Sequence, residues 1–305
     1  MFLTRFLLRV FLALLSFPFF AKGETPYTTV DIFPAGNKHT HSSSIVQCPN
    51  GDLLACWYHG SGERTADDVV VQGARLKKGA KHWGPVFEMA DTPDFPDCNP
   101  ILHIDPEDRL RLFWVSVLAN RWECSLLKVK LAEDFQGQGP PIWSWQDIVP
   151  LKPGPKFAQT MKQRFEEIKL NTAMWAEYAR PYEDLLLKAA LDPFKRQTGW
   201  MPRTKPLNLP NGRILLPLYS DGFNVSLIAI SDDNGDTWRT SQPIIGLGPI
   251  QPSLARRRDG TIIAFCRDSG PPPGRVMTSF SHDNGETWNA AQDTTLPNPG
   301  SSLDV

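Results

Sequence analysis

The sequence predicts an all-β protein of the β-propeller kind. Proline and tryptophan are frequent and helix-favouring runs are few, a composition typical of many short strands joined by tight turns. Four segments share one order of features: an apolar stretch, a turn, two further strands and a tryptophan. Counting the strand around the tryptophan, each segment supplies four strands. The last two segments repeat at about 50 residues, the period of propeller blades.

Each repeat contains a hairpin turn, as Asn50-Gly51 and Asn211-Gly212 illustrate, because asparagine and glycine accept the backbone angles of tight turns. The expected innermost strands are the stretches 44–46, 100–102, 206–208 and 252–254. The strands that follow and the closing tryptophans are, in chain order, 53–58, 69–71 and Trp83; 110–114, 126–129 and Trp143; 214–219, 227–230 and Trp238; and 261–265, 276–280 and Trp288.

Residues 301–303 resemble the start of a fifth unit, and the sequence stops at Val305. Four blades and a start do not close a ring, so we expect a propeller that is truncated at its C-terminus by one or two blades of a typical ring. An early strand at 27–32 would close the circle by joining the final blade. A β-sandwich is the alternative architecture, and the regular spacing of the repeats disfavours it.

One stretch, about 156–192, interrupts the repeats and predicts a helical insertion between the second and third blades. Apolar residues from Phe157 to Trp175 recur at steps of three and four, the period of an amphipathic helix. Pro181 is expected to end this helix before a shorter one. The apolar stripe either packs on the propeller or belongs to a lid over the central funnel.

Residues 1–23 predict a cleaved signal peptide, with the mature chain beginning near Glu24. Arg5 and Arg9 give a positive start, and 10–21 is an apolar run followed by small residues suited to a signal peptidase. A membrane anchor is the alternative, but a spanning helix needs about 20 apolar residues. We therefore expect an exported protein, periplasmic or secreted, with no membrane span after cleavage.

The 32 lysines and arginines nearly balance the 33 aspartates and glutamates. Because nucleic-acid binders usually present a basic face, we expect no nucleic-acid partner. The five cysteines show no C-x-x-C pattern, which favours buried apolar side chains with at most one or two disulfides over a metal site. We expect neither a metal nor a cofactor. The cysteines are Cys48, Cys56, Cys98, Cys124 and Cys266.

Two units carry the octapeptide pattern S-x-D-x-G-x-T-W, at 231–238 and 281–288. The aspartate can accept hydrogen bonds within its own turn, glycine permits the reversal, and tryptophan fills the space between neighbouring sheets. We therefore interpret Asp233 and Asp283 as structural, not as a catalytic carboxylate pair. The structural residues of the two patterns are Ser231, Asp233, Gly235, Trp238, Ser281, Asp283, Gly285 and Trp288.

These octapeptides resemble the Asp-box, or bacterial neuraminidase (BNR) repeat, of sialidases. The resemblance covers nearly all of the mature chain and is closest to the predicted-neuraminidase branch, in the stretches 199–203, 216–221, 250–253, 267–268 and 296–299. It implies that 24–305 form an incomplete six-bladed propeller of the sialidase type, with the Asp-boxes away from the active face. It also implies an exo-acting glycoside hydrolase of the exo-α-sialidase type, which releases a terminal acidic sugar from glycans.

Polar side chains stand just before each expected innermost strand, at one register of the repeat. In a propeller the ends of these strands line the central funnel and carry most ligand contacts. We therefore expect His41, Asn99, Arg203 and Gln251 to bind the substrate. The complete polar set is His39, His41, Asp97, Asn99, Arg203, Lys205 and Gln251.

A sialidase needs arginines for the sugar carboxylate, because the guanidinium fork matches a carboxylate with two charged hydrogen bonds. In the family an arginine and then an acid/base aspartate follow the second strand of the first blade, where this chain has 63–68. The resemblance therefore implies Arg64 as a substrate arginine and Asp67 or Asp68 as the catalytic acid. A solvated charged loop is the alternative.

Two arginines outside this loop are further candidates for contacts with the anion. Arg203 precedes an innermost strand, and Arg267 follows the second strand of the fourth blade. The neighbouring Asp268 either contacts the substrate or holds Arg267 in place.

The chain departs from the sialidase pattern in two ways. The Arg-Ile-Pro motif of the first innermost strand is replaced by 41–46, His-Ser-Ser-Ser-Ile-Val, so the first arginine is absent or replaced by His41. The tyrosine nucleophile of sialidases and the last arginine are expected beyond Val305. Tyr58 and Tyr219 are interpreted as packing or wall residues.

Three functions are consistent with the sequence. The first is a sialidase-like glycoside hydrolase acting on a glycan or polysaccharide. The second is a polysaccharide lyase, or a hydrolase of uronic or rhamnose-type sugars, with His41 or His39 as base. The third is a non-catalytic glycan-binding propeller.

Overall fold

A computed structural model describes residues 29–168, 183–270 and 272–305. Residues 1–30 and 31–305 form two separate units, and every sheet lies in the second. The predicted signal peptide, 1–23, lies outside the described residues. Of the early strand expected at 27–32, residues 29–32 are described and are not in a strand. No helix among the described residues is long and apolar enough to span a membrane.

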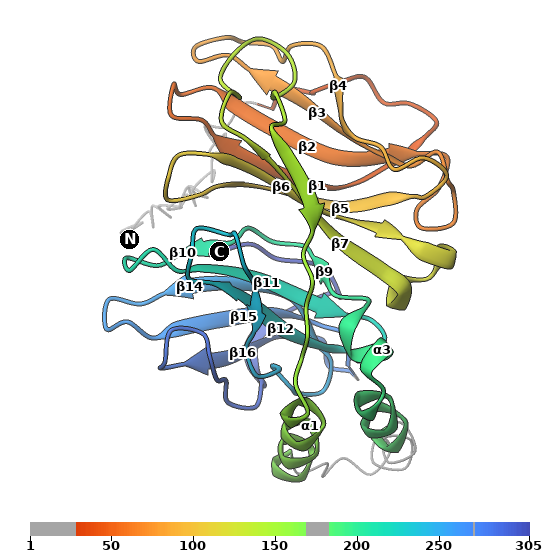
Figure 1. The fold of residues 1–305 in the computed structure, drawn as a ribbon, viewed down its shortest axis with the longest axis vertical. Helices are drawn as coiled ribbons and strands as arrows, with labels where there is room; N and C mark the ends of the chain where they lie inside the picture. Colours follow the sequence, from red (N-terminus) through yellow and green to blue (C-terminus); the bar gives the residue numbers. More distant parts are fainter. Residues whose placement is uncertain (1–28, 169–182, 271) are drawn as a thin grey trace, which may run out of the picture. The chain divides into compact units, whose positions relative to one another are not determined.

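The chain forms four antiparallel sheets that follow one another in sequence order (Figure 1). The first comprises β1 (His39–Gln47), β2 (Leu53–Gly60), β3 (Val70–Leu76) and β4 (Phe87–Ala90). The second comprises β5 (Asp97–Ile104), β6 (Leu110–Val117), β7 (Ser125–Ala132) and β8 (Trp145–Ile148). The third comprises β9 (Met201–Pro202), β10 (Leu207–Asn208), β11 (Ile214–Ser220), β12 (Val225–Ser231) and β13 (Arg239–Thr240). The fourth comprises β14 (Pro249–Arg256), β15 (Ile262–Asp268), β16 (Arg275–Ser281) and β17 (Gln292–Pro297).

Each sequence repeat is therefore one blade, which confirms an all-β propeller arrangement of four blades. The six blades implied by the resemblance are not confirmed, because the described residues contain four sheets and 301–305 are not in a strand. In the third blade the innermost strand is split, since β9 and β10 both pair with β11. Pro206 lies between these two pieces and lacks the N–H that a continuous ladder needs.

The middle strands of the blades are buried on both faces. Every residue of β6 and β11 is buried, because neighbouring blades cover both sides of each sheet, and the strands are therefore continuous apolar runs. One apolar cluster joins the first two blades through Cys56 and Trp114, and another joins the last two through Leu215 and Cys266. All five cysteines are free thiols.

The helical insertion predicted for about 156–192 is not confirmed. The connection between the second and third blades contains α1 (Lys156–Glu167), a helical segment at 183–191 and α3 (Pro193–Gln197), while 169–182, including Pro181, lie outside the described residues. α1 ends because the backbone of Ile168 is extended. Two short 3-10 turns, η1 (Leu118–Asn120) and η2 (Trp122–Cys124), connect β6 to β7.

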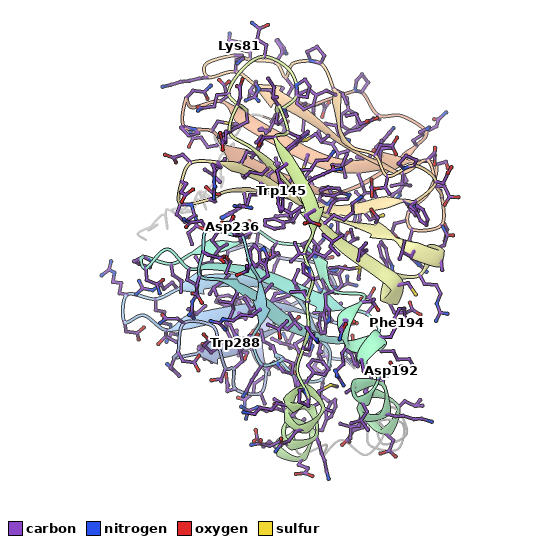
Figure 2. The ribbon with its side chains drawn as sticks, in the orientation of Figure 1. Lys81, Trp145, Asp192, Phe194, Asp236 and Trp288 are labelled. Carbon is purple, nitrogen blue, oxygen red and sulfur yellow. The ribbon has the colours of Figure 1, made fainter. Side chains whose placement is uncertain are left out.

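Local sequence explains where these helices begin and what they contact. The Asp192 side chain accepts a hydrogen bond from the backbone N–H of Phe194, and Pro193 occupies the first turn, a favoured start for a helix. Both labelled side chains lie at the start of α3 in Figure 2. On α1, the ring of Phe157 packs against that of Phe223, with centroids 5.3 Å apart. Arg164 Nη2 donates to the carbonyl of Trp288 at 2.9 Å. α1 therefore packs on the third and fourth blades.

Both Asp-boxes form closed hydrogen-bonded turns. Ser231 Oγ donates to Asp233 Oδ1 at 2.8 Å, the backbone N–H of Thr237 donates to the same oxygen at 2.9 Å, and Trp238 Nε1 donates to the carbonyl of Gly235 at 3.1 Å. The second box repeats these bonds at Ser281, Asp283, Thr287, Gly285 and Trp288. The boxes connect the third strand of a blade to the fourth, and their carboxylates are used within the turn.

Candidate functional site

Three of the four innermost strands carry a bulge at the same register. The ladders shift between His41 and Ser44 in β1, between Cys98 and Ile101 in β5, and between Ile250 and Ser253 in β14. Each bulge contains one non-glycine residue with a positive φ: Ser42 at 58°, Asn99 at 51° and Gln251 at 51°. A bulge redirects side chains, and a left-handed backbone outside glycine is uncommon and clusters at functional sites. The bulges therefore set the directions of these side chains.

Arg203 also stands at a break in an innermost ladder. It directly follows the pair Pro202–Leu218 of the third blade, as Gln251 directly follows the pair Ile250–Arg267 of the fourth. The breaks in the innermost ladders therefore place Asn99, Arg203 and Gln251 beside one another in three blades.

The innermost strands and the ends of the middle strands surround a cavity of about 370 Å³. Its walls come from all four blades. They include five of the six predicted substrate-binding residues: His41, Asn99, Arg203, Gln251 and Arg267. The other lining residues are Glu63, Trp122, Tyr219, Asp221, Ile250 and Ser269.

The two cavity arginines have no carboxylate partner. Arg203 Nη2 lies 3.4 Å from His41 Nε2, and neither Arg203 nor Arg267 forms an ion pair with any described residue. Arg267 Nε is buried without a hydrogen-bond partner. By contrast, the buried Arg111 lies 3.1 Å from a carboxylate oxygen of Asp105. The guanidinium groups of Arg203 and Arg267 are therefore available to an anion in the cavity.

His41 carries a neutral imidazole. Partial burial and the neighbouring Arg203 lower its pKa from the usual 6.5. Because arginine can only donate, His41 Nε2 accepts from Arg203 and the ring proton sits on Nδ1. The rings of His39 and Tyr58 each lie 5.7 Å from that of His41. Its one acceptor nitrogen, Nε2, can therefore take up a proton only when Arg203 turns away from it.

Two carboxyl groups also face the cavity. Asp221 is exposed at the edge of the cavity, and partial desolvation there raises its pKa, with repulsion from Glu63 and Glu123 adding to it and Arg267 and Arg64 opposing it. A raised pKa favours the protonated form, which a general acid needs. Glu63 accepts a hydrogen bond from Tyr58 Oη at 2.5 Å. Burial raises the pKa of Tyr58, and the neighbouring Glu63 carboxylate raises it further. The Tyr58 hydroxyl therefore stays protonated and holds Glu63 in place.

The three residues predicted as catalytic do not line this cavity. Arg64 stacks over the cavity residue Trp122, 5.5 Å from the ring centroid. Asp67 Oδ1 accepts from Asn120 Nδ2 at 3.3 Å. Asp68 pairs with Lys38 at 2.9 Å. Hydrogen bonds from Ser61 and then the Lys38 ammonium lower its pKa, which favours a permanent carboxylate over a proton donor.

Asp268 has a local structural contact. Its oxygens accept from the backbone N–H groups of Gly270 at 2.7 Å and Arg275 at 2.9 Å. It therefore fixes the loop between β15 and β16 beside Arg267. No hydrogen bond joins it to Arg267 among the described residues.

The sequence reasoning missed the cavity residues Glu63, Asp221 and Trp122 and interpreted Tyr219 as a wall residue. Tyr219 lies near the end of β11, and Asp221 is the first residue after that strand. These residues could have been predicted from the polar positions that directly follow a middle strand. The ends of the middle strands lie beside the same cavity as the bulges of the innermost strands.

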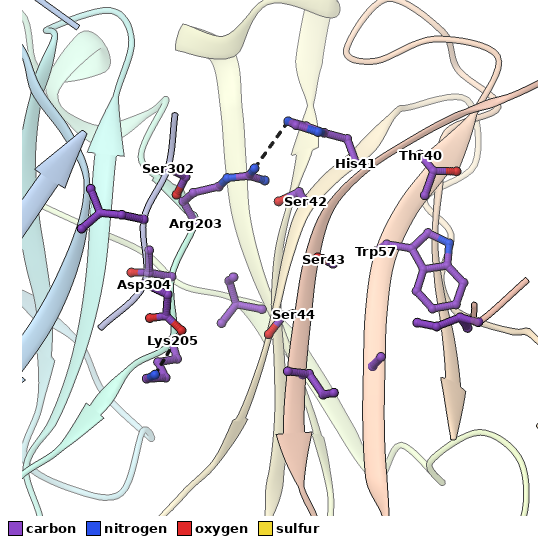
Figure 3. A pocket seen from close by; sticks show the side chains of 16 residues that line it. Thr40, His41, Ser42, Ser43, Ser44, Trp57, Arg203, Lys205, Ser302 and Asp304 are labelled. Carbon is purple, nitrogen blue, oxygen red and sulfur yellow. Dashed lines mark hydrogen bonds and ion pairs between the residues drawn. The ribbon is translucent and has the colours of Figure 1, made fainter. Parts of the chain in front are cut away.

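A second pocket of about 610 Å³ adjoins the cavity and shares His41 and Arg203 with it (Figure 3). Ser42, Ser43 and Ser44 line one side of this pocket in Figure 3. The contact between Arg203 and His41 thus forms a partition between the two pockets. Among the described residues, no group of three histidine, cysteine, aspartate or glutamate side chains is arranged to hold a metal ion.

Comparison with known proteins agrees with this fold. Residues 192–305 match the model of the BNR repeat-like domain. A protein of unknown function from Dyadobacter fermentans superposes with a TM-score of 0.60 at 16% identity, covering 88% of this chain and 72% of that one. A mutant of the NanB sialidase from Streptococcus pneumoniae gives 0.62 at 11%, covering 90% and 56%. The intramolecular trans-sialidase from Ruminococcus gnavus gives 0.59 at 14%, covering 87% and 73%. No curated protein matches the sequence significantly.

The prediction from the two Asp-boxes is confirmed to this extent: residues 192–305 match a BNR repeat-like domain, and the fold is shared with sialidases of known structure. The chain spans about half the length of the pneumococcal sialidase (56%). At these identities the likeness to solved structures concerns the fold alone.

Proposed function

We propose that this protein is an exo-acting, sialidase-like glycoside hydrolase that binds a terminal acidic sugar of a glycan in the four-blade cavity. One observation carries the proposal: two cavity arginines, Arg203 and Arg267, lack carboxylate partners in the part of the chain that the structure describes. A buried or half-buried guanidinium without a partner is costly, and an anionic ligand removes that cost. A sugar carboxylate has the geometry that the guanidinium fork prefers.

The cavity also supplies groups for bond cleavage. Asp221, with its raised pKa, donates a proton to the leaving oxygen of the glycosidic bond. The Glu63 carboxylate, held by Tyr58, stabilises the positive charge that develops on the sugar ring in an oxocarbenium-like transition state. Arg64 packs over the ring of Trp122. In this scheme Asp67 and Asp68 stabilise the loop that carries Glu63.

A lyase is the second candidate, and the neutral imidazole of His41 favours it. A base that removes the proton next to the carboxylate of a uronic acid starts a β-elimination, in which the glycosidic oxygen leaves and a carbon–carbon double bond forms. Hydrolysis instead adds water across the glycosidic bond. The two reactions therefore give products that differ by one water molecule.

The experiment is incubation of the full-length protein with a glycan panel that ends in sialic, uronic and neutral sugars, followed by mass spectrometry of the released sugar. If the protein is a hydrolase, we expect saturated acidic monosaccharides, formed by addition of water across the glycosidic bond, and no release of neutral sugars. Release of unsaturated sugar would replace it with the lyase. Binding of acidic glycans without any release would leave a glycan-binding propeller.

We further propose that the protein meets its glycan after export through the signal peptide predicted at residues 1–23. Cell fractionation of the native host, followed by N-terminal sequencing of the mature protein, tests this. A chain beginning near Glu24 in the exported fraction is expected. A full-length chain retained in the cytoplasm contradicts it.

A further inference from the structure

Three blades contribute to one buried hydrogen-bonded group at the cavity wall. Asn99 Nδ2 donates to Tyr219 Oη at 3.1 Å, and the neighbouring Gln251 side chain lowers the pKa of Tyr219 against the larger effect of burial, which raises it. Asn99, Tyr219 and Gln251 are 4%, 4% and 6% exposed, and all three line the cavity. The network therefore fixes how these side chains face a ligand.

The carbonyl oxygen of the Gln251 amide is left without a partner. Oε1 is buried and accepts no hydrogen bond from the described residues. An unsatisfied buried acceptor costs on the order of 1–3 kcal/mol, so a ligand that brings a donor removes an existing penalty.

The position of Gln251 is itself costly to maintain. Its backbone has a φ of 51° inside the bulge of β14, in a region that non-glycine residues rarely adopt. Its neighbour Ile250 pairs directly with Arg267 on β15. The unpartnered acceptor of Gln251 and the unpartnered donor of Arg267 therefore belong to adjacent positions of two paired strands.

We infer that Gln251 is a specificity-determining residue that recognises a hydrogen-bond donor, a hydroxyl or an amide N–H, adjacent to the ligand carboxylate. This inference rests on the proposed function, in which Arg267 and Arg203 bind that carboxylate. Tyr219 and Asn99 act as positioning residues, because they hold the Gln251 amide in the orientation that offers its oxygen. A site built around such an acceptor discriminates strongly against ligands that lack the donor.

The test measures binding of defined probes to the full-length protein by calorimetry. N-acetylneuraminate and methyl β-D-glucuronide carry a carboxylate and hydroxyl donors, whereas cyclohexanecarboxylate carries a ring carboxylate without donors. At least one sugar acid is expected to bind about tenfold more tightly than cyclohexanecarboxylate. In Gln251→Met, which keeps the side-chain length, this preference is expected to vanish while the affinity for cyclohexanecarboxylate is unchanged.

Gln159→Met, at an exposed position of α1, is the matched control and should leave both affinities unchanged. Tyr219→Phe removes the hydroxyl that orients the amide and should reduce the preference in part, which keeps the inference testable if Gln251→Met does not fold. If Gln251→Met lost the same affinity for every carboxylate probe, Gln251 would have a structural role. That result would overturn this inference and leave the proposed function standing. If no carboxylate binds the wild-type protein, the proposed function fails and the inference with it.

Discussion

Arg203 and His41 meet across the centre of the blades, with Arg203 Nη2 3.4 Å from His41 Nε2 although the residues are 162 positions apart in sequence. The dashed line in Figure 3 marks this contact between the first and third blades. A neutral imidazole is a weak partner for a guanidinium compared with a carboxylate. Arg203 is therefore held in direction without being neutralised, as an anion-binding group requires.

Removal of Arg203 should cost binding but little stability. Arg203→Met gives up no ion pair and relieves a half-buried charge, so the free energy of unfolding should change by less than about 1 kcal/mol. Arg111→Met should lose more, about 1–3 kcal/mol, because it removes the buried guanidinium that pairs with Asp105, although Arg109 keeps its own contact with that carboxylate. Urea unfolding of both variants checks this, with the exposed Arg258→Met as control. A large loss for Arg203→Met would indicate a structural arginine.

The sequence and the cavity point to different catalytic acids: the sequence to Asp67 or Asp68, and the cavity to Asp221. Asp221→Asn should lower kcat by at least about 100-fold with KM little changed, since general acid catalysis contributes about 10²–10⁴. Asp68→Asn should keep most of the turnover, because Asp68 is paired with Lys38 outside the cavity. Steady-state kinetics on the best glycan of the panel measures both. The reverse ranking would return the role of acid to the 63–68 loop.

The Asp-box carboxylates should matter for stability and not for ligand binding. Asp233→Ala removes the acceptor for Ser231 and Thr237 and should cost about 1–3 kcal/mol of unfolding free energy. Asp236→Ala, an exposed neighbour in the same turn, should cost less than about 0.5 kcal/mol. Urea unfolding and sugar-acid titration are measured together. A loss of affinity in folded Asp233→Ala would contradict the structural role.

Stability should fall at mildly acidic pH because His103 is buried as a neutral imidazole. Burial lowers its pKa from 6.5 to about 4. Between these values the unfolded chain binds a proton that the folded protein does not, so stability is complete above the unfolded pKa of 6.5 and declines as pH falls toward 4. His103→Gln should flatten this decline, a difference of about 3 kcal/mol across the interval. Unfolding free energies at pH 7.5 and 4.5 measure it, and equal slopes for the two proteins would refute it.

Local signals predicted the blades well. Hairpin turns and apolar runs placed strands at 53–58 and 214–219, close to β2 (Leu53–Gly60) and β11 (Ile214–Ser220). The periodic pattern of apolar residues did not predict the split of the innermost strand at Pro206 or the end of α1 at Ile168. Both depend on the backbone of a single residue. The sequence of one repeat specifies the fold of one blade and not how many blades form the ring. The four repeats therefore did not determine the number of blades.

The sequence predicted which residues lie beside the cavity where the repeat itself carries the information. Asn99 and Gln251 stand at equivalent bulges, so their recurrence predicted a shared level in the ring. Asp68 could not be judged in this way, because its direction is set by Lys38 and Ser61 rather than by its neighbours in the loop. Asp221 was overlooked because only the tertiary arrangement shows that the end of β11 reaches the cavity.

The most direct test of the central claim is calorimetric titration of the full-length protein with N-acetylneuraminate and methyl β-D-glucuronide, comparing wild type with the double variant Arg203→Met and Arg267→Met. At least one sugar acid should bind the wild-type protein, and the double variant should bind it at least about 100-fold more weakly while Arg258→Met binds normally. An unchanged affinity in the double variant would contradict the account, because the carboxylate would then be bound somewhere other than the cavity of the four blades.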